Sequence, residues 1–174
     1  GRSIVERGLL WWAPRERLTK LIHVEGEVDL AERSERPVMW LSPHFVGLEI
    51  GGAATQLYQE KTGADVYTAQ SNPVLDAAFN KGRARFGKAL LFNRQLGALP
   101  LVRAIKKGVA FYNASDMDFG LRDAAFVPFF GVSASTLLAP SRMARSLGMA
   151  VQPVVTEMLP GGRGYVVRFG EPWT

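Results

Sequence analysis

The chain has 174 residues, a length that fits one domain, and 47% of them are apolar, which is enough to build a substantial core. The absence of cysteine excludes disulfides, thiol catalysis and cysteine-based metal sites. A net charge of +5 and a pI near 9.8 favour an anionic partner, such as a lipid headgroup or an acidic carrier protein. The sequence has no aromatic–glycine RNA-binding signature and no zinc-finger spacing, so we expect no nucleic-acid partner.

Apolar periodicity and turn residues predict helices alternating with strands in chain order. The expected helices cover residues 4–12, 45–61, 73–86, 99–107 and 135–147, and the expected strands 21–28, 38–41, 65–69, 89–92, 109–113, 149–158 and 165–169. Residues 126–130 form a short apolar segment that either lines an acyl channel or belongs to the core. This alternation predicts an α/β fold with a mixed, largely parallel sheet flanked by helices.

The predicted organisation is a single domain over residues 1–174, because the sequence contains no repeat and no linker. No stretch approaches the roughly 20 apolar residues that span a bilayer, and there is no signal peptide. The chain begins at Gly1 and stops soon after a predicted strand. We therefore expect it to be an excerpt of a longer protein.

The strongest candidate for chemistry is a histidine close to the end of a buried strand. His44 is one of only two histidines, and Glu49 follows it by five positions. Ser42 suits the N-cap and Pro43 the first helical position, so we expect His44 in the first turn of a helix, where the dipole disfavours imidazolium. A neutral imidazole is what a general base requires, and Glu49 is expected to fix its tautomer.

One geometric tension accompanies this prediction. In a regular helix, side chains five positions apart point about 140° away from each other. The pair therefore needs an irregular first turn. The alternative is that His44 is a histidine of the capping region and Glu49 a solvated glutamate.

Other charged residues follow predicted strands or lie at a helix end. Asp116 and Asp118 come after the strand at 109–113, where paired acids can bind a metal, orient a cation or simply cap a turn. Arg94 follows the strand at 89–92 and either clamps a phosphate or lies on the surface. Arg83 and Arg85 belong to a basic cluster with two lysines, and this cluster either meets anionic groups or forms a solvated face. Lysines 81 and 88 complete it.

Several other mechanisms do not fit the sequence. Residues 131–135 read Gly-Val-Ser-Ala-Ser, which departs from the Gly-x-Ser-x-Gly nucleophile elbow at its last position. The sequence has no phosphate-binding loop of the Gly-x4-Gly-Lys-Ser/Thr type and no metal-ligand spacing, so no metal is expected.

The ordered set of motifs resembles a known family. The set comprises His44-x4-Glu49, Ser71-Asn72-Pro73 with Asp76, Asn93-Arg94, Lys106-Lys107-Gly108, Asp-Met-Asp-Phe-Gly at 116–120 and Phe-Val-Pro-Phe-Phe-Gly at 126–131. It is similar to the lauroyl and myristoyl acyltransferases of lipid A biosynthesis, the late acyltransferases of Gram-negative bacteria. This family belongs to the wider glycerolipid acyltransferase superfamily, whose fold the resemblance implies.

The resemblance implies transfer of a fatty acyl chain from acyl carrier protein to a hydroxyl of a lipid A precursor, without a metal or organic cofactor. It implies an anionic lipid acceptor and work at the cytoplasmic face of the inner membrane, with the membrane anchor absent from this chain. His44 matches the family's base and Glu49 its acidic partner. Arg94, Asp116 and Asp118 match further motif positions, with roles in binding or site organisation.

Two alternatives remain open. The chain is either an acyltransferase for another lipid, such as a phosphatidylinositol mannoside or an amino-acid lipid, or a non-catalytic basic module that binds membranes. Substitution of His44 separates the last case from the others, because a binding module would be indifferent to it.

Overall fold

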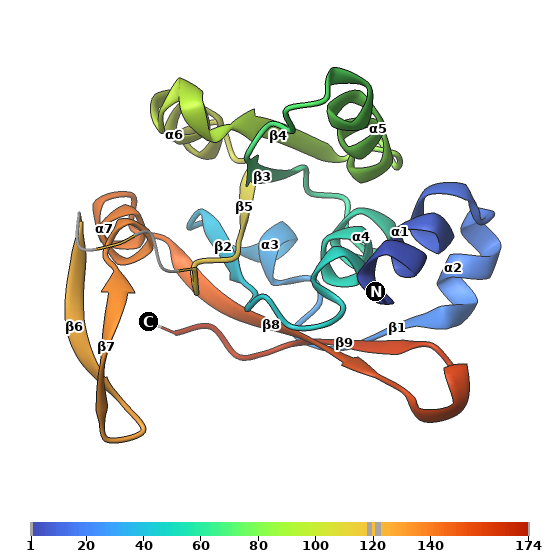
Figure 1. Cartoon of the computed structure of the whole chain (residues 1–174). Helices are drawn as coiled ribbons and strands as arrows, with labels where there is room; N and C mark the ends of the chain where they lie inside the picture. The colour runs from blue at the N-terminus through green and yellow to red at the C-terminus, as the bar shows by residue number, and fades with distance from the viewer. Residues whose placement is uncertain (1, 118–119, 121–122, 174) are drawn as a thin grey trace.

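A seven-stranded sheet forms the centre of the computed structural model, which describes residues 2–117, 120 and 123–173 (Figure 1). The strand order is β1-β9-β8-β2-β5-β3-β4. All neighbours are parallel except β8 and β9, which form an antiparallel pair. The strands are β1 (Ile22–Gly26), β2 (Val38–Leu41), β3 (Gly63–Tyr67), β4 (Ala89–Asn93), β5 (Ala110–Asn113), β8 (Ala150–Met158) and β9 (Tyr165–Phe169). The predicted α/β class with a mixed, largely parallel sheet is confirmed.

Both faces of the sheet are covered by helices, which explains why its central strands are apolar throughout. In β2, Val38 and Trp40 enter one core, whereas Met39 between them enters the other. The larger core packs against α1 (Arg2–Trp12), α2 (Arg15–Leu21), α3 (Leu30–Arg33) and α4 (Leu48–Tyr58), with α5 (Pro73–Arg83) resting on α1 and α4. The smaller core packs against α6 (Leu99–Lys106) and α7 (Ala139–Ser146).

A two-stranded antiparallel hairpin stands apart from the main sheet. It consists of β6 (Ala124–Phe129) and β7 (Val132–Leu137), and the sequence did not predict it. The expected helix at 135–147 is wrong in its first part, because the turn at Phe130 and Gly131 reverses the chain and β7 pairs with β6. Helix α7 begins only at Ala139, with Pro140 in its first turn. The apolar segment at 126–130 is exposed, so of its two alternatives the one that places it in the core is wrong.

The start of the helix that follows β2 also differs from the prediction. Helix α4 begins at Leu48 because Gly47 adopts a positive φ of 99°, which regular helix does not allow. A Cβ at Gly47 would lie 2.6 Å from Cγ2 of Thr156 on β8. His44 therefore lies in the loop before α4, and its expected place in the first helical turn is wrong.

Most other boundaries agree with the sequence to within three residues, although β3 begins and ends two residues before the expected strand at 65–69. The short helices α2 and α3 were not expected, and two 3-10 turns complete the fold: η1 (Arg94–Leu96) and η2 (Pro160–Gly162). The final strand pair, β8 and β9, is confirmed with its turn around η2. Among the described residues, no helix has the length and apolar character needed to cross a membrane.

Candidate active site

His44 and Asp116 meet at the carboxyl ends of two adjacent parallel strands. His44 follows β2, and Asp116 follows β5. The Nδ1 atom of His44 lies 2.5 Å from Oδ1 of Asp116, and the backbone N–H of His44 donates to Oδ2 at 2.8 Å. The aspartate thus holds the histidine through both its ring and its backbone. Both side chains remain accessible, with 40% of His44 and 43% of Asp116 exposed, so a substrate can reach the ring.

The loop that carries His44 is anchored to β5. Beyond the paired strands, the backbone N–H of Ser42 donates to the carbonyl of Asn113. The buried hydroxyl of Tyr112 lies 3.0 Å from the hydroxyl of Ser42 and donates to the carbonyl of Leu48 at 2.9 Å. These bonds close the loop at both of its ends, so the position of His44 relative to β5 is fixed by buried hydrogen bonds.

Asp116 is suited to orient a basic imidazole. Partial burial by itself would raise the pKa of Asp116, but the hydrogen bonds from the ring and backbone of His44 hold it below its usual range. Asp116 is therefore a carboxylate at neutral pH and accepts a hydrogen bond from the Nδ1–H group of His44. When Nδ1 carries the hydrogen, Nε2 is left with its lone pair available. The arrangement can remove a proton from a group placed at Nε2.

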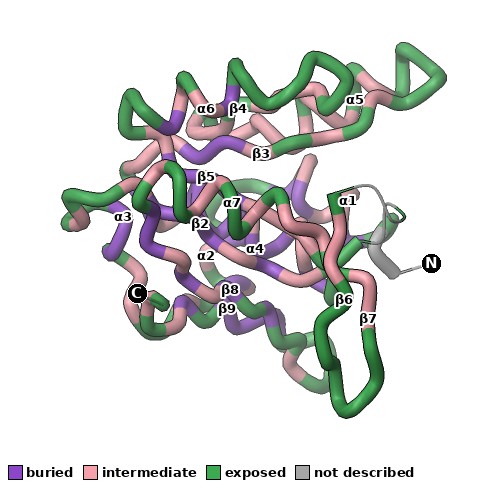
Figure 2. Tube along the Cα trace, turned by 90° about the vertical axis from the view of Figure 1, so that its left-hand side faces the viewer, coloured by how far each residue is buried: buried purple, intermediate pink, exposed green. Residues whose placement is uncertain are grey.

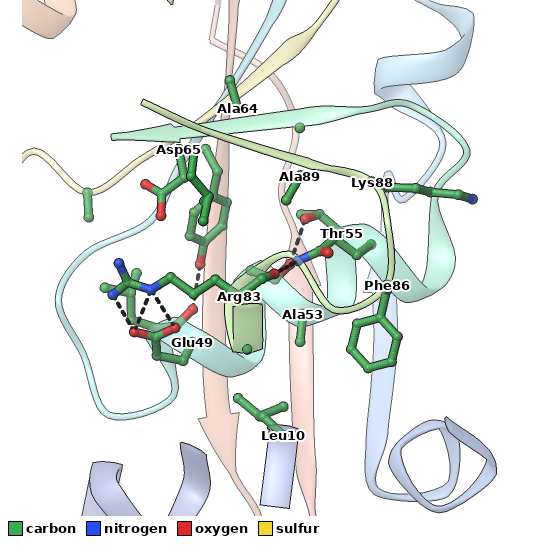
Figure 3. A pocket seen from close by; sticks show the side chains of 18 of the residues that line it. Leu10, Glu49, Ala53, Thr55, Ala64, Asp65, Arg83, Phe86, Lys88 and Ala89 are labelled. Carbon is green, nitrogen blue, oxygen red and sulfur yellow. Dashed lines mark hydrogen bonds and ion pairs between the residues drawn. The ribbon is translucent and has the colours of Figure 1, made fainter. Parts of the chain in front are cut away.

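Glu49 has different partners from the one that the sequence predicted. Its carboxylate accepts hydrogen bonds from Nε of Arg83 at 3.2 Å to each oxygen and from Nη2 of Arg83 at 2.6 Å (Figure 3). Nη2 of Arg7 also donates to Oε1 of Glu49 at 3.3 Å. The His44 ring is paired with Asp116 instead. The expected hydrogen bond between Glu49 and His44 is therefore corrected. The physical reason is that Glu49 lies in the first turn of α4 and faces α5 and α1, whereas His44 lies in the loop beside β5.

The two arginines decide the charge state of Glu49. Burial alone would raise the pKa of Glu49, but hydrogen bonds and the positive charge from Arg83, and then from Arg7, keep it below its usual value. The pKa of Arg83 is raised in turn, because the effect of Glu49 outweighs the opposing effect of burial. Glu49 and Arg83 are therefore an ion pair at neutral pH, with only 18% and 26% of their side chains exposed.

This ion pair lines a pocket between α4, α5, β3 and α1. The pocket has a volume of about 80 Å³, larger than the roughly 10–15 Å³ that one buried water requires. Apolar and charged side chains share its wall. The larger apolar ones are Leu10, Trp11, Leu48, Phe86 and Leu91, and Glu49, Asp65, Arg83 and Lys88 carry the charge. Ala114, which also lines it, is two residues from Asp116, so the pocket borders the loop that completes the His44 pair.

Asp65 is a second acidic group in this pocket, and the sequence alone did not point to it. Its carboxylate stands beside the Arg83–Glu49 pair in Figure 3. Although some of its surface is accessible through the pocket, protein atoms surround it closely. Burial raises the pKa of Asp65 to about 6, and the negative charge of Glu49 adds to the rise, while Arg83 opposes it. The signal that could have identified Asp65 as a candidate site residue is an acidic side chain in the middle of a short strand.

The basic cluster at 81–88 is engaged largely within the protein. Arg85 donates to the carbonyl oxygens of Leu10 and Ala13 at 2.6 Å, which completes the carboxyl end of α1. Lys88 bonds to the carbonyl of Gln59 and to Glu60. Since Arg83 binds Glu49, the cluster is not the solvated face that the sequence analysis considered.

Arg94 and Asp118 complete the set of predicted site residues. Arg94 is exposed in η1, directly after the carboxyl end of β4. Three strand spacings separate β4 from β2, so the two strands are about 14 Å apart across the sheet. Asp118 lies outside the described residues. Among the residues that are described, no group of three or more His, Cys, Asp or Glu side chains could hold a metal ion.

Comparison with known proteins shows the family to which this chain belongs. Residues 1–171 match the family described as bacterial lipid A biosynthesis acyltransferase, and the chain belongs to this family. The resemblance drawn from the ordered motifs is therefore confirmed.

Individual relatives give the same family. The chain is 32% identical over 168 residues to the lipid A biosynthesis lauroyltransferase of Escherichia coli (strain K12), covering 95% of the chain and 54% of that relative. It is 35% identical over 134 residues to the palmitoleoyltransferase of the same strain, covering 76% and 42%. A lipid A biosynthesis acyltransferase of Haemophilus influenzae (strain ATCC 51907 / DSM 11121 / KW20 / Rd) is 30% identical over 174 residues, covering 99% and 55%. The chain spans about half the length of these relatives.

Proposed function

We propose that this chain carries the catalytic centre of an acyltransferase that moves a fatty acyl group from acyl carrier protein to a hydroxyl of a lipid A precursor. The observation that carries the proposal is the His44–Asp116 pair, which is exposed at the carboxyl ends of β2 and β5 beside a pocket. Sites of open α/β sheets collect at such strand ends. Membership of the lipid A biosynthesis acyltransferase family supports the reaction class and the lipid acceptor.

His44 is the proposed general base. A hydroxyl loses its proton only far above neutral pH, so its attack on a thioester needs a base at the reacting oxygen. Nε2 of His44 takes the proton while the hydroxyl oxygen bonds to the thioester carbonyl carbon. The tetrahedral intermediate then collapses, its carbon–sulfur bond breaks, and the thiolate of the carrier protein leaves. The imidazolium returns the proton to that sulfur, so His44 ends the cycle neutral.

Asp116 is the proposed positioning residue for the ring. Its two oxygens hold both Nδ1 and the backbone N–H of His44. Its negative charge stabilises the imidazolium that forms during attack. Glu49 stays a predicted catalytic residue from the family motif. We propose that its ion pair with Arg83 shapes the wall of the pocket that receives the reacting end of the substrate.

Of the other residues predicted to bind substrate, Arg94 keeps that role in our proposal, whereas Arg83 and Arg85 do not. Arg94 is exposed at the same edge of the sheet as the His44 pair, so it suits a contact with an anionic headgroup or phosphate. Arg83 and Arg85 act through the protein groups that they hold. Asp118 is proposed to share in organising the site, as its motif position implies. The net charge of +5 supports an acidic carrier protein and an anionic lipid surface as partners. We propose that the acyl transfer takes place at the cytoplasmic face of the inner membrane.

The test is acyl transfer by the protein and three variants, with an acyl carrier protein thioester as donor and product formation followed by mass spectrometry of lipid A. His44→Ala should lower turnover by about 10²–10⁴-fold, the usual contribution of a general base. Asp116→Asn should lower kcat, whereas Glu49→Gln tests the pocket wall. If His44→Ala keeps more than a tenth of the turnover, the proposed mechanism is wrong. If Glu49→Gln lowers acyl transfer more than Asp116→Asn does, and the two variants fold equally well, Glu49 is the partner of the base.

A further inference from the structure

The turn of the β6–β7 hairpin presents large apolar side chains to solvent. Phe130 is 93% exposed, Val132 70%, Phe126 65% and Phe129 64%. The hairpin pairs only with itself and projects from the body beside α7, and its strands are exposed along much of their length (Figures 1 and 2). Exposed apolar patches of this kind mark contact surfaces.

The backbone of the turn makes this exposure more informative. Phe130 has a φ of 49° and Gly131 a φ of 80°, so both residues of the two-residue turn are left-handed. Asn, Asp or Gly suits the first of these positions, whereas a bulky aromatic residue there is strained. The ring of Phe130 packs edge-on against Phe129 with centroids 4.7 Å apart, and it remains almost fully exposed. The folded chain thus places an aromatic side chain at an unfavourable backbone position and leaves it in water.

The distribution of charge favours lipid as the occupant. Residues 124–141, which contain the whole hairpin and the start of α7, include no charged side chain. Exposed arginines begin immediately afterwards with Arg142 and Arg145 on α7. Arg142 is tied to Asp123 at the base of the hairpin, so α7 and the hairpin base are joined. An uncharged apolar end with cations behind it matches the order of hydrocarbon and anionic headgroups in a bilayer.

We propose that the β6–β7 hairpin is a membrane-docking element that inserts Phe129, Phe130 and Val132 into the interfacial layer of an anionic phospholipid bilayer. A strand of six residues spans about 20 Å, so the turn can enter the roughly 5–10 Å of the interfacial layer while the base stays in water. Val127, Phe129, Val132 and Ala134 share one face of the hairpin, because the register pairs Phe129 with Val132 and Val127 with Ala134. This face would lie against the lipid. The choice of lipid over protein rests on the proposed function.

The hairpin follows the partner of His44 closely in the sequence. Asp116 precedes Ala124, the first residue of β6, by eight positions in the sequence.

A single fluorescent probe tests the insertion. The chain contains no cysteine, so Phe130→Cys creates one labelling site for a polarity-sensitive dye. Trp12→Cys is the matched control, because Trp12 is 76% exposed and ends α1, which packs on α4 and α5 away from the hairpin (Figure 1). On addition of vesicles of phosphatidylglycerol and phosphatidylcholine in equal parts, the dye at position 130 should shift to the emission of an apolar medium. The dye at position 12 should not. An unchanged emission at position 130 would overturn the proposal.

Binding measurements separate lipid from other occupants. Phe129→Ser/Phe130→Ser should weaken sedimentation with these vesicles by about tenfold or more, with unchanged circular dichroism, whereas Trp12→Ser should bind as the parent protein does. If the dye at position 130 reports an apolar medium without vesicles, another segment or a second copy covers the turn and the proposal is wrong. Sedimentation as a dimer would identify the second copy.

His44→Ala distinguishes this inference from the proposed function. It should abolish acyl transfer and leave vesicle binding unchanged. If the parent protein binds vesicles through the hairpin but transfers no acyl group, the proposed function fails and the docking proposal stands. If it transfers acyl groups and the serine variant binds vesicles normally, the docking proposal fails alone.

Discussion

The ion pair between Glu49 and Arg83 should couple α4 to α5 strongly enough to measure. Three hydrogen bonds of 2.6–3.2 Å join the two charged groups, which is the geometry of a strong charge-assisted pair. Removing one partner of a fully buried pair costs about 3–5 kcal/mol. A quarter of the Arg83 side chain is exposed and Arg7 remains near Glu49, so we expect Arg83→Met to cost about 2–3 kcal/mol.

The assay is a double-mutant cycle with urea unfolding followed by circular dichroism. The four proteins are the parent, Arg83→Met, Glu49→Gln and the double variant. The double variant should be more stable than the sum of the two single losses by about 1.5 kcal/mol, because neither Glu49 nor Arg83 is then left as a buried charge without the other. Glu49→Gln/Arg83→Met also removes two of the charges that line the pocket, so it should lower acyl transfer even where it folds.

The stability that the Glu49–Arg83 pair contributes should depend on pH in a defined direction. The pKa of Glu49 is lowered in the folded protein, so its contribution to stability is fully present above the pKa of an unfolded glutamate, about 4.3. It should be lost as the pH falls through the lowered value. The pair Arg168 and Glu157 is the control, because it is also an Arg–Glu contact but is half exposed on both sides. Its coupling should be much smaller. A coupling for Glu49 and Arg83 below about 0.5 kcal/mol would refute the reasoning, since that is the range of exposed pairs.

Three further changes test other features of the site. Asp116→Asn should lower kcat by about 10²–10⁴-fold with little change in KM, because it removes the carboxylate that stabilises the His44 imidazolium; an unchanged kcat would contradict this role. The pKa of Asp65 is raised to about 6, so the parent protein should lose stability as the pH rises from about 4 to about 7 and this carboxyl loses its proton. The free energy of unfolding of the Asp65→Asn variant, measured with urea, should lack this fall of about 2–3 kcal/mol over that pH range. An identical pH profile in parent and variant would refute the prediction. Gly47→Ala should lower the melting temperature and acyl transfer together, because its Cβ would lie 2.6 Å from Thr156 at a φ of 99°; a variant as stable as the parent would contradict the steric argument.

The strand framework was largely predictable from apolar runs. Strand β2 was predicted with its observed bounds, and β4, β5, β8 and β9 within a residue or so, because strands covered on both faces carry continuous apolar sequence. Proline and glycine marked the beginning of α5 at Pro73 and the end of α6 before Gly108. These are local effects on the backbone and need no knowledge of the rest of the fold.

The hairpin was missed because its signal is weak at the level of sequence. Both residues of its turn have positive φ, but the first is Phe130, where sequence rules look for Asn, Asp or Gly. The apolar residues of β6 also suggested a buried segment, because burial is the usual fate of such a run. Whether a run lies in a core or in solvent depends on which other elements cover it, and this is a property of the assembled fold.

By itself, the sequence determined the class of the fold, the family and the candidate base. These depend on periodicity, on composition and on the ordered motifs that contain His44. The tertiary structure decided which groups the functional side chains meet. In the fold, the ring of His44 is hydrogen-bonded to Asp116, 72 positions away, and Glu49 is hydrogen-bonded to Arg83, 34 positions away. The reason is physical: hydrogen-bond partners are set by which strand ends and helix faces the sheet order places side by side, and the short spacing between His44 and Glu49 carries no information about that order.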